Sequence, residues 1–106
     1  MKNFLELPEL LREREAKKKG YLEFLRVASM SAGVYVLPAG GADPQTPHHE
    51  DELYYVIRGR ARMKVGDEDR AVETGSVIFV AGEVEHRFYD VAEELVLLVF
   101  FAPPES

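Results

Sequence analysis

The chain contains no cysteine among its 106 residues. This absence excludes disulfide bonds, thiolate metal ligands and cysteine nucleophiles, so any metal ion must be held by nitrogen and oxygen atoms. Positive charge is also scarce, because 13 Lys and Arg residues stand against 19 Asp and Glu residues and give a formal net charge of -6. An acidic chain is not attracted to a phosphate backbone, and we therefore expect no nucleic acid partner.

A long apolar run is missing from the beginning of the chain. The first eight residues, Met1 to Pro8, include an acid and too few consecutive apolar residues for a signal peptide or a membrane span. We expect a cytoplasmic protein with no membrane partner. The length and the 46% of apolar residues predict a single folded domain with one core.

One helix is predicted, near the N-terminus. The segment from Leu7 to Gly20 has Pro8 in its first turn, three lysines in its last turn and a glycine as its stop. It has few apolar residues, so it can lie on the body of the protein but cannot form the core. We therefore divide the single domain into a helical segment, residues 1–20, and a β domain, residues 21–106.

After Gly20 the pattern alternates with a period of two, which is typical of strands. Eight short strands are predicted: Tyr21 to Val27, Ala32 to Leu37, Glu52 to Ile57, Ala61 to Val65, Arg70 to Val72, Val77 to Val80, His86 to Tyr89 and Leu95 to Phe101. Parallel strands would need further helices as crossovers, so the sequence predicts an all-β fold, an antiparallel barrel or jelly roll with one N-terminal helix. Five side chains are expected to fill the barrel: Tyr54, Val56, Val77, Phe79 and Phe88.

Two segments concentrate the residues that can carry chemistry. The first runs from His48 to Glu52 and holds two histidines and three acids in succession. On an extended chain His48, Glu50 and Glu52 share one face, whereas His49 points the other way. The second segment delivers His86 at the start of a strand. If His86 lies across the barrel from His48 and Glu52, two imidazoles and a carboxylate can bind a divalent transition metal and leave positions for water or substrate.

These segments resemble the two motifs of the cupin superfamily. In the first motif, six residues separate Glu52 from Gly59 and His48 stands four residues before Glu52, but Thr46 occupies the place of the first histidine. The second motif maps its glycine to Gly75 and its histidine to His86. Its other positions differ from the usual Pro, Gly and Asn and are occupied here by Ala81, Glu83 and Asp90.

The resemblance implies a cupin-type barrel with a metal held by His48, Glu52 and His86. The metal could be zinc, iron, manganese, nickel or copper. Glu50 has the right facing for a fourth ligand, His49 could serve only if the strand is bulged, and a water molecule is the other option.

Two functions are compatible with this resemblance. The first is a metal-dependent enzyme for a small-molecule substrate, of the dioxygenase, isomerase or decarboxylase type. The second is a non-catalytic cupin that binds a metal or a small ligand in a structural or sensing role.

A homodimer is also expected. The segment Glu94 to Phe101 is apolar on both faces, and the N-terminal helix offers little apolar surface to cover the outer face.

Overall fold

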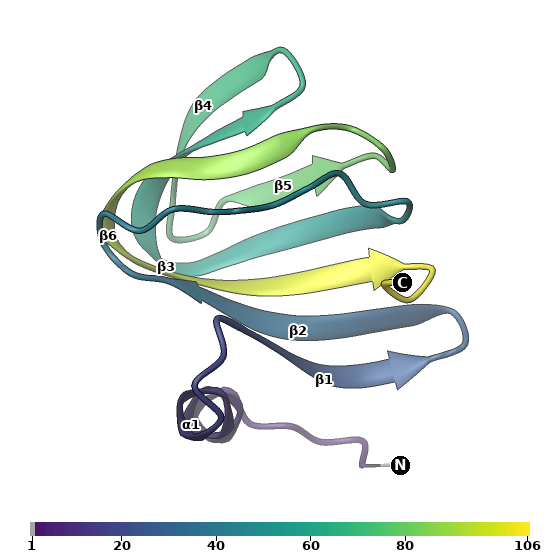
Figure 1. Ribbon diagram of the computed structural model, residues 1–106. Helices are drawn as coiled ribbons and strands as arrows, with labels where there is room; N and C mark the ends of the chain where they lie inside the picture. Colours follow the sequence, from purple (N-terminus) through teal and green to yellow (C-terminus); the bar gives the residue numbers. More distant parts are fainter. Residues whose placement is uncertain (1) are drawn as a thin grey trace.

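The computed structural model describes residues 2–106, which form one helix and six antiparallel strands (Figure 1). Their bounds are α1 Leu7–Ala16, β1 Tyr21–Val27, β2 Met30–Leu37, β3 Asp51–Val65, β4 Glu68–Glu73, β5 Val77–Val80 and β6 His86–Ala102. The strands form one sheet in the order β1-β2-β6-β3-β4, and β5 pairs with β3 off this path. This architecture confirms the predicted all-β fold with one N-terminal helix.

Two strands are much longer than the sequence predicted. The predicted strands from Glu52 to Ile57 and from Ala61 to Val65 are one strand, β3, and the last two predicted strands are both parts of β6. The prediction of a break at Gly59 was wrong, because this glycine bends β3 without interrupting its pairing. Gly59 has a φ of 102°, and the register between β3 and β6 shifts on both sides of it. The bend folds the sheet over on itself (Figure 1).

The inner face of the folded sheet forms the main core. Tyr54, Val56 and Phe88 are fully buried there, as predicted. Val77 and Phe79 are more than half exposed, so the prediction that they fill the barrel was wrong. In the short strand β5 the inward-facing residues are instead Ile78, which is partly buried, and Val80, which is buried.

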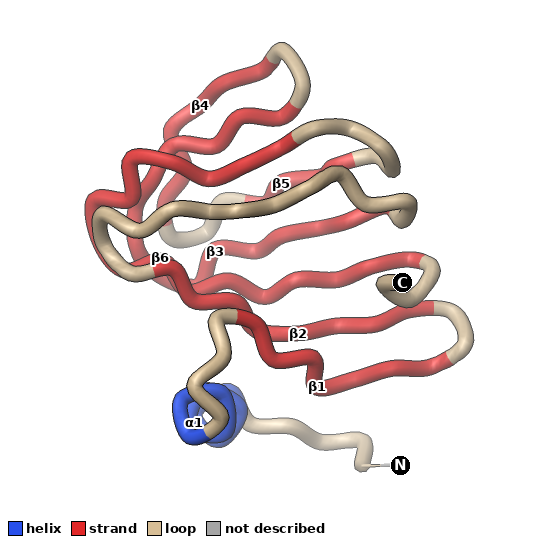
Figure 2. Tube along the Cα trace, viewed as in Figure 1, coloured by secondary structure: helices blue, strands red, loops and turns tan. Residues whose placement is uncertain are grey.

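Helix α1 lies against the outer face of the sheet beside β1 and β2 (Figure 2). Leu10 is its buried residue and packs in a small second cluster with Leu22, Val34 and the partly buried Leu98 of β6. The helix ends before the predicted Gly20, and Lys18 adopts the left-handed conformation that follows it. The helix therefore covers part of the outer β6 face that the sequence analysis left for a second copy. Within residues 2–106, no helix has the length and apolar character needed to cross a membrane.

The connection between β2 and β3, residues 38–50, is long and contains no strand. Figure 2 shows it running back across the opening of the folded sheet. Asp43 fixes its middle, because the Asp43 carboxylate accepts hydrogen bonds from the Tyr35 hydroxyl at 2.6 Å and from the Phe88 backbone N–H at 2.9 Å. This loop therefore delivers its side chains to the open end of the barrel.

Candidate metal centre

Two neighbouring side chains, His48 and Glu52, meet the distant His86 at the opening of the sheet. His48 comes from the β2–β3 loop, Glu52 from the beginning of β3, and His86 from the first position of β6. His86 pairs with Val65 at the far end of β3, whereas Glu52 lies near its beginning. The two residues can meet because the bend at Gly59 folds one half of β3 over the other.

The geometry of the three groups is compact. The Nε2 atom of His86 lies 3.1 Å from Oε1 of Glu52, and Nε2 of His48 lies 4.0 Å from the same oxygen. One potential ligand atom from each residue lies within 4.8 Å of those of the other two. Glu52 and His86 are buried, with 3% and 7% of their surfaces exposed. The structure thus brings together the two imidazoles and the carboxylate that the sequence analysis proposed as ligands.

The hydrogen bonds around these atoms are compatible with a bound cation. Nδ1 of His86 lies 2.9 Å from the Val84 carbonyl oxygen, which can only accept, so Nδ1 carries a proton and Nε2 faces Glu52 with its lone pair when the ring is neutral. Across the described chain, Oε1 of Glu52 has no hydrogen-bond partner, and its 3.1 Å contact with Nε2 of His86 is an ion pair only when that ring is protonated. A buried carboxylate oxygen without a partner is costly. A divalent metal ion between these atoms would satisfy all of them.

Electrostatics agree with this interpretation. Burial lowers the pKa of His86, but the Glu52 carboxylate and the Val84 carbonyl outweigh burial and raise the pKa above its ordinary value. The negative charge of Glu52 therefore attracts positive charge to this point, whether a proton or a metal ion.

A fourth side chain, which the sequence analysis missed, lies at the same point. The amide oxygen of Gln45 is 3.2 Å from Nε2 of His48 and 3.2 Å from Nε2 of His86. Gln45 stands in an irregular loop, where the alternation rule for strands does not apply. The only sequence signal was its position next to Thr46, which occupies the place of the missing histidine and lines the wall of the adjoining cavity.

Glu50 and His49, the other ligand candidates, lie outside this group. Glu50 is buried, and its Oε2 accepts hydrogen bonds from the backbone N–H and the hydroxyl of Ser106. Burial acts to raise the pKa of Glu50, but these hydrogen bonds dominate and lower it. His49 is exposed and pairs through Nδ1 with Glu83.

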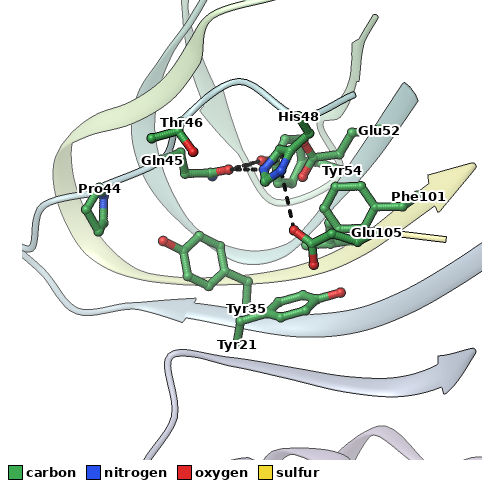
Figure 3. Close-up of a pocket in the computed structure, with 11 residues that line it drawn as sticks. Tyr21, Tyr35, Pro44, Gln45, Thr46, His48, Glu52, Tyr54, Phe101 and Glu105 are labelled. Atoms are coloured by element: carbon green, nitrogen blue, oxygen red, sulfur yellow. Dashed lines mark hydrogen bonds and ion pairs between the residues drawn. The ribbon is translucent and has the colours of Figure 1, made fainter. Parts of the chain in front are cut away.

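The ligand group opens onto a cavity of about 240 Å³ (Figure 3). Its walls are formed by Tyr21, Tyr35, Pro44, Gln45, Thr46, His48, Glu52, Tyr54, Val99, Phe101 and Glu105. Burial raises the pKa of the three tyrosine hydroxyls, so they stay protonated and can donate hydrogen bonds. The Glu105 carboxylate lies 3.4 Å from Nδ1 of His48. The described residues that line this cavity include two glutamates but neither lysine nor arginine.

Comparison with known proteins identifies the family. Residues 33–101 match the family described as "Cupin domain". The chain belongs to the cupin family. An uncharacterized protein of Streptomyces coelicolor is 49% identical to this cupin over 100 residues, which cover 94% of this chain and 95% of the relative.

Solved structures share the same cupin fold. The protein TT1209 from Thermus thermophilus matches with a TM-score of 0.78 at 23% identity, covering 97% of this chain and 99% of its own. DMSP lyase DddQ from Ruegeria pomeroyi matches with a TM-score of 0.67 at 25% identity, covering 72% of this chain and 39% of its own. This cupin thus spans less than half of the lyase.

Proposed function

We propose that this cupin is a divalent-metal-dependent enzyme that acts on a small oxygen-bearing molecule. The observation that carries the proposal is the convergence of His48, Glu52 and His86 on one buried point, where Oε1 of Glu52 lacks a hydrogen-bond partner within residues 2–106. Two imidazoles and one carboxylate form a ligand set that leaves coordination positions open. His48 and Glu52 line the cavity, so a substrate in the cavity would lie beside a metal held by them.

The size of the cavity limits the substrate. Sites for drug-sized ligands usually enclose about 300–1,000 Å³, whereas this cavity has about 240 Å³. Its walls combine the aromatic rings of Tyr21, Tyr54 and Phe101 with hydroxyl groups. A compact molecule with a flat or apolar part and one or two oxygen atoms fits these walls.

The charge of the cavity limits the substrate further. Glu52 and Glu105 contribute negative charge, and the described lining supplies no side-chain cation to balance it. A phosphate group would meet this negative field with only the metal to attract it. We therefore favour neutral carbonyl or hydroxyl compounds, such as β-dicarbonyls and catechols, over sugar phosphates.

The residues of the chain have separate roles in this proposal. A divalent ion held by His48, Glu52 and His86 would polarise a carbonyl or hydroxyl oxygen of the substrate. The Tyr21 hydroxyl has no hydrogen-bond partner in the described residues and is a donor that can orient a second oxygen, whereas the Tyr35 and Tyr54 hydroxyls already donate to Asp43 and Gln45. Phe101 packs edge-on against the His48 ring, with 5.1 Å between the ring centroids, and so restricts the position of that imidazole.

The proposal is tested with metal-loaded protein and a panel of β-dicarbonyls, catechols and sugar phosphates. We expect turnover, or an increase in melting temperature, with the neutral compounds. Glu52→Gln should abolish turnover and leave the circular dichroism spectrum unchanged, because it removes a charged ligand and conserves its shape. His49→Ala is the matched control and should retain turnover, because this exposed ring lies outside the site.

The second candidate function is a non-catalytic cupin that binds a metal or small ligand for a structural or sensing role. The burial of Glu52 and His86 favours it, since a buried metal can serve stability alone. Metal uptake without turnover or ligand-induced stabilisation across the panel would contradict the enzyme proposal and support this one.

We also propose that two copies of this cupin associate through an outer patch formed by Leu53, Tyr55, Val77 and Phe79. Leu53 pairs with Phe79 and Tyr55 with Val77 in neighbouring strands, and the four side chains are between 38% and 63% exposed. The patch is uncharged and continuous across β3 and β5. A twofold interface places the same surface on both subunits, so an uncharged patch can pack on its own copy without charge repulsion.

Light scattering on the eluting protein tests the dimer. The unmodified chain should elute with twice its own mass at micromolar concentration, and Phe79→Glu should elute as a monomer. Phe4→Glu is the control, because Phe4 is exposed as well but lies in the N-terminal segment outside the patch. A monomeric unmodified protein would refute this assembly.

A further inference from the structure

Gln45 reaches the metal-ligand group, although the family motif assigns no ligand to its position. The motif places the first metal-binding histidine at position 46, where this chain has Thr46. The side chain that reaches the ligand group is instead that of the preceding residue. Figure 3 shows the Gln45 amide pointing from the loop toward His48, with a dashed line between its oxygen and that ring.

We infer that the Oε1 atom of Gln45 is the fourth protein ligand of the metal and replaces the histidine missing at position 46. This inference rests on the proposed metal site. The oxygen lies 3.2 Å from Nε2 of each histidine, and the carboxylate of Glu52 approaches the same nitrogens at 3.1 Å and 4.0 Å. The Gln45 and Glu52 oxygens therefore each lie within 4.0 Å of both imidazole nitrogens.

The orientation of the Gln45 amide is fixed by the hydrogen bonds of its NH₂ group. The Nε2 atom donates hydrogen bonds to Oδ2 of Asp43 at 3.0 Å and to the Tyr54 hydroxyl oxygen at 2.9 Å. A carboxylate only accepts, so the NH₂ group must face Asp43. Asp43 is itself held by Tyr35 and Phe88, so the amide oxygen is directed at the histidines by a rigid set of contacts.

The donor and acceptor balance at the centre favours positive charge there, and a bound metal ion would supply it. Nδ1 of His86 donates to the Val84 carbonyl, so a neutral His86 presents a lone pair to two further acceptors, the Gln45 and Glu52 oxygens. Three electron-rich atoms facing one another at about hydrogen-bond distance repel unless a positive charge lies among them. The Oε1 atom of Glu52 is one of three buried polar atoms without a hydrogen-bond partner in the described residues, and it lies 3.1 Å from Nε2 of His86.

The chemistry of the fourth ligand affects which metal is preferred. Imidazole suits zinc, copper and nickel, whereas carbonyl and carboxylate oxygens suit harder ions such as manganese. Replacing a third imidazole by an amide oxygen gives two nitrogen and two oxygen ligands. The site should therefore bind Mn²⁺ more strongly, relative to Zn²⁺, than a site with a histidine at this position would.

The test measures binding of Mn²⁺ and Zn²⁺ alone to metal-free protein by calorimetry, and the visible spectrum of bound Co²⁺. Gln45→Leu keeps a similar volume without the oxygen and should weaken Mn²⁺ binding at least about tenfold and change the Co²⁺ spectrum. Thr46→Val is the matched control on the neighbouring residue and should bind as the unmodified chain does. Gln45→His should shift the preference toward Zn²⁺ by about tenfold.

The outcomes separate this inference from the proposed site. If the unmodified chain takes up no divalent ion, the metal site itself is refuted, and the inference falls with it. If the unmodified chain binds Mn²⁺ and Gln45→Leu binds it equally well with the same Co²⁺ spectrum, the site stands and Gln45 is not a ligand. Should Gln45→Leu fail to fold, Gln45→His decides, because an unchanged ratio of Mn²⁺ to Zn²⁺ affinity would overturn the inference.

Discussion

Removing the metal should lower the melting temperature of this cupin. The ligands come from the β2–β3 loop, from the beginning of β3 and from the beginning of β6, so they are assembled only in the folded chain. A ligand that binds the folded state alone stabilises it by RT ln(1 + [L]/Kd), about 2.7 kcal/mol at a free metal concentration one hundred times Kd. For a domain of this length each kcal/mol corresponds to roughly 4 °C. We expect the metal-loaded and stripped proteins to differ by about 10 °C.

Calorimetric melting of the two forms measures this difference, after metal analysis has shown that one is loaded and the other empty. His86→Ala removes a ligand and should abolish the metal-dependent shift. His49→Ala should keep it, because the exposed His49 ring pairs with Glu83 outside the site. The two variants carry the same chemical change, histidine to alanine, at a proposed ligand position and at a position outside the site.

Two results would refute this reasoning. The first is identical melting of protein shown to be fully loaded and protein shown to be empty. The second is loss of the shift in His49→Ala together with its retention in His86→Ala, because the metal would then lie outside the point where His86 and Glu52 meet.

Two further predictions concern pH and the bend in β3. Protons compete with metal for the histidines, so the metal-dependent shift should shrink as pH falls from about 8 to about 6. The metal-free protein should show the opposite pH dependence. Because the pKa of His86 is raised, the stability that the His86–Glu52 pair contributes is lost as pH rises through that raised pKa. Melting temperatures measured with and without chelator across this pH range test both trends. Gly59→Ala should lower the free energy of unfolding in urea by about 2–4 kcal/mol, since its Cβ would lie 2.2 Å from a backbone oxygen at a φ of 102°. Gly75→Ala, with a φ of 93° and open space around it, should lose only about 1–2 kcal/mol, and an equal loss for both variants would contradict the role of close approach at Gly59.

The alternation of apolar and polar residues was sufficient to predict much of the fold. It placed Tyr54 and Val56 on the buried face of β3, because side chains on a strand alternate strictly between two faces. It failed for Val77 and Phe79, since β5 is apolar on both faces and the pattern cannot tell which face is the inner one. It also predicted a break at Gly59, where β3 in fact continues with shifts in its register against β6.

The candidate site shows a similar division. Motif spacing singled out His48, Glu52 and His86, because these residues lie inside or next to regular strands. Gln45 was missed because its orientation depends on contacts of the loop with Asp43, which is two residues away in sequence but is anchored by distant strands. No periodic rule describes such contacts, so only the folded chain reveals them.

The tyrosines of the cavity have an optical consequence. The chain contains no tryptophan and five tyrosines, so its intrinsic fluorescence arises from tyrosine alone and no indole can accept the excitation energy. Three of these five, Tyr21, Tyr35 and Tyr54, line the cavity beside the ligand group. A paramagnetic ion or an absorbing substrate bound there would quench a large share of the emission. The unlabelled protein can therefore report occupancy of its own site by the dimming of its ultraviolet emission.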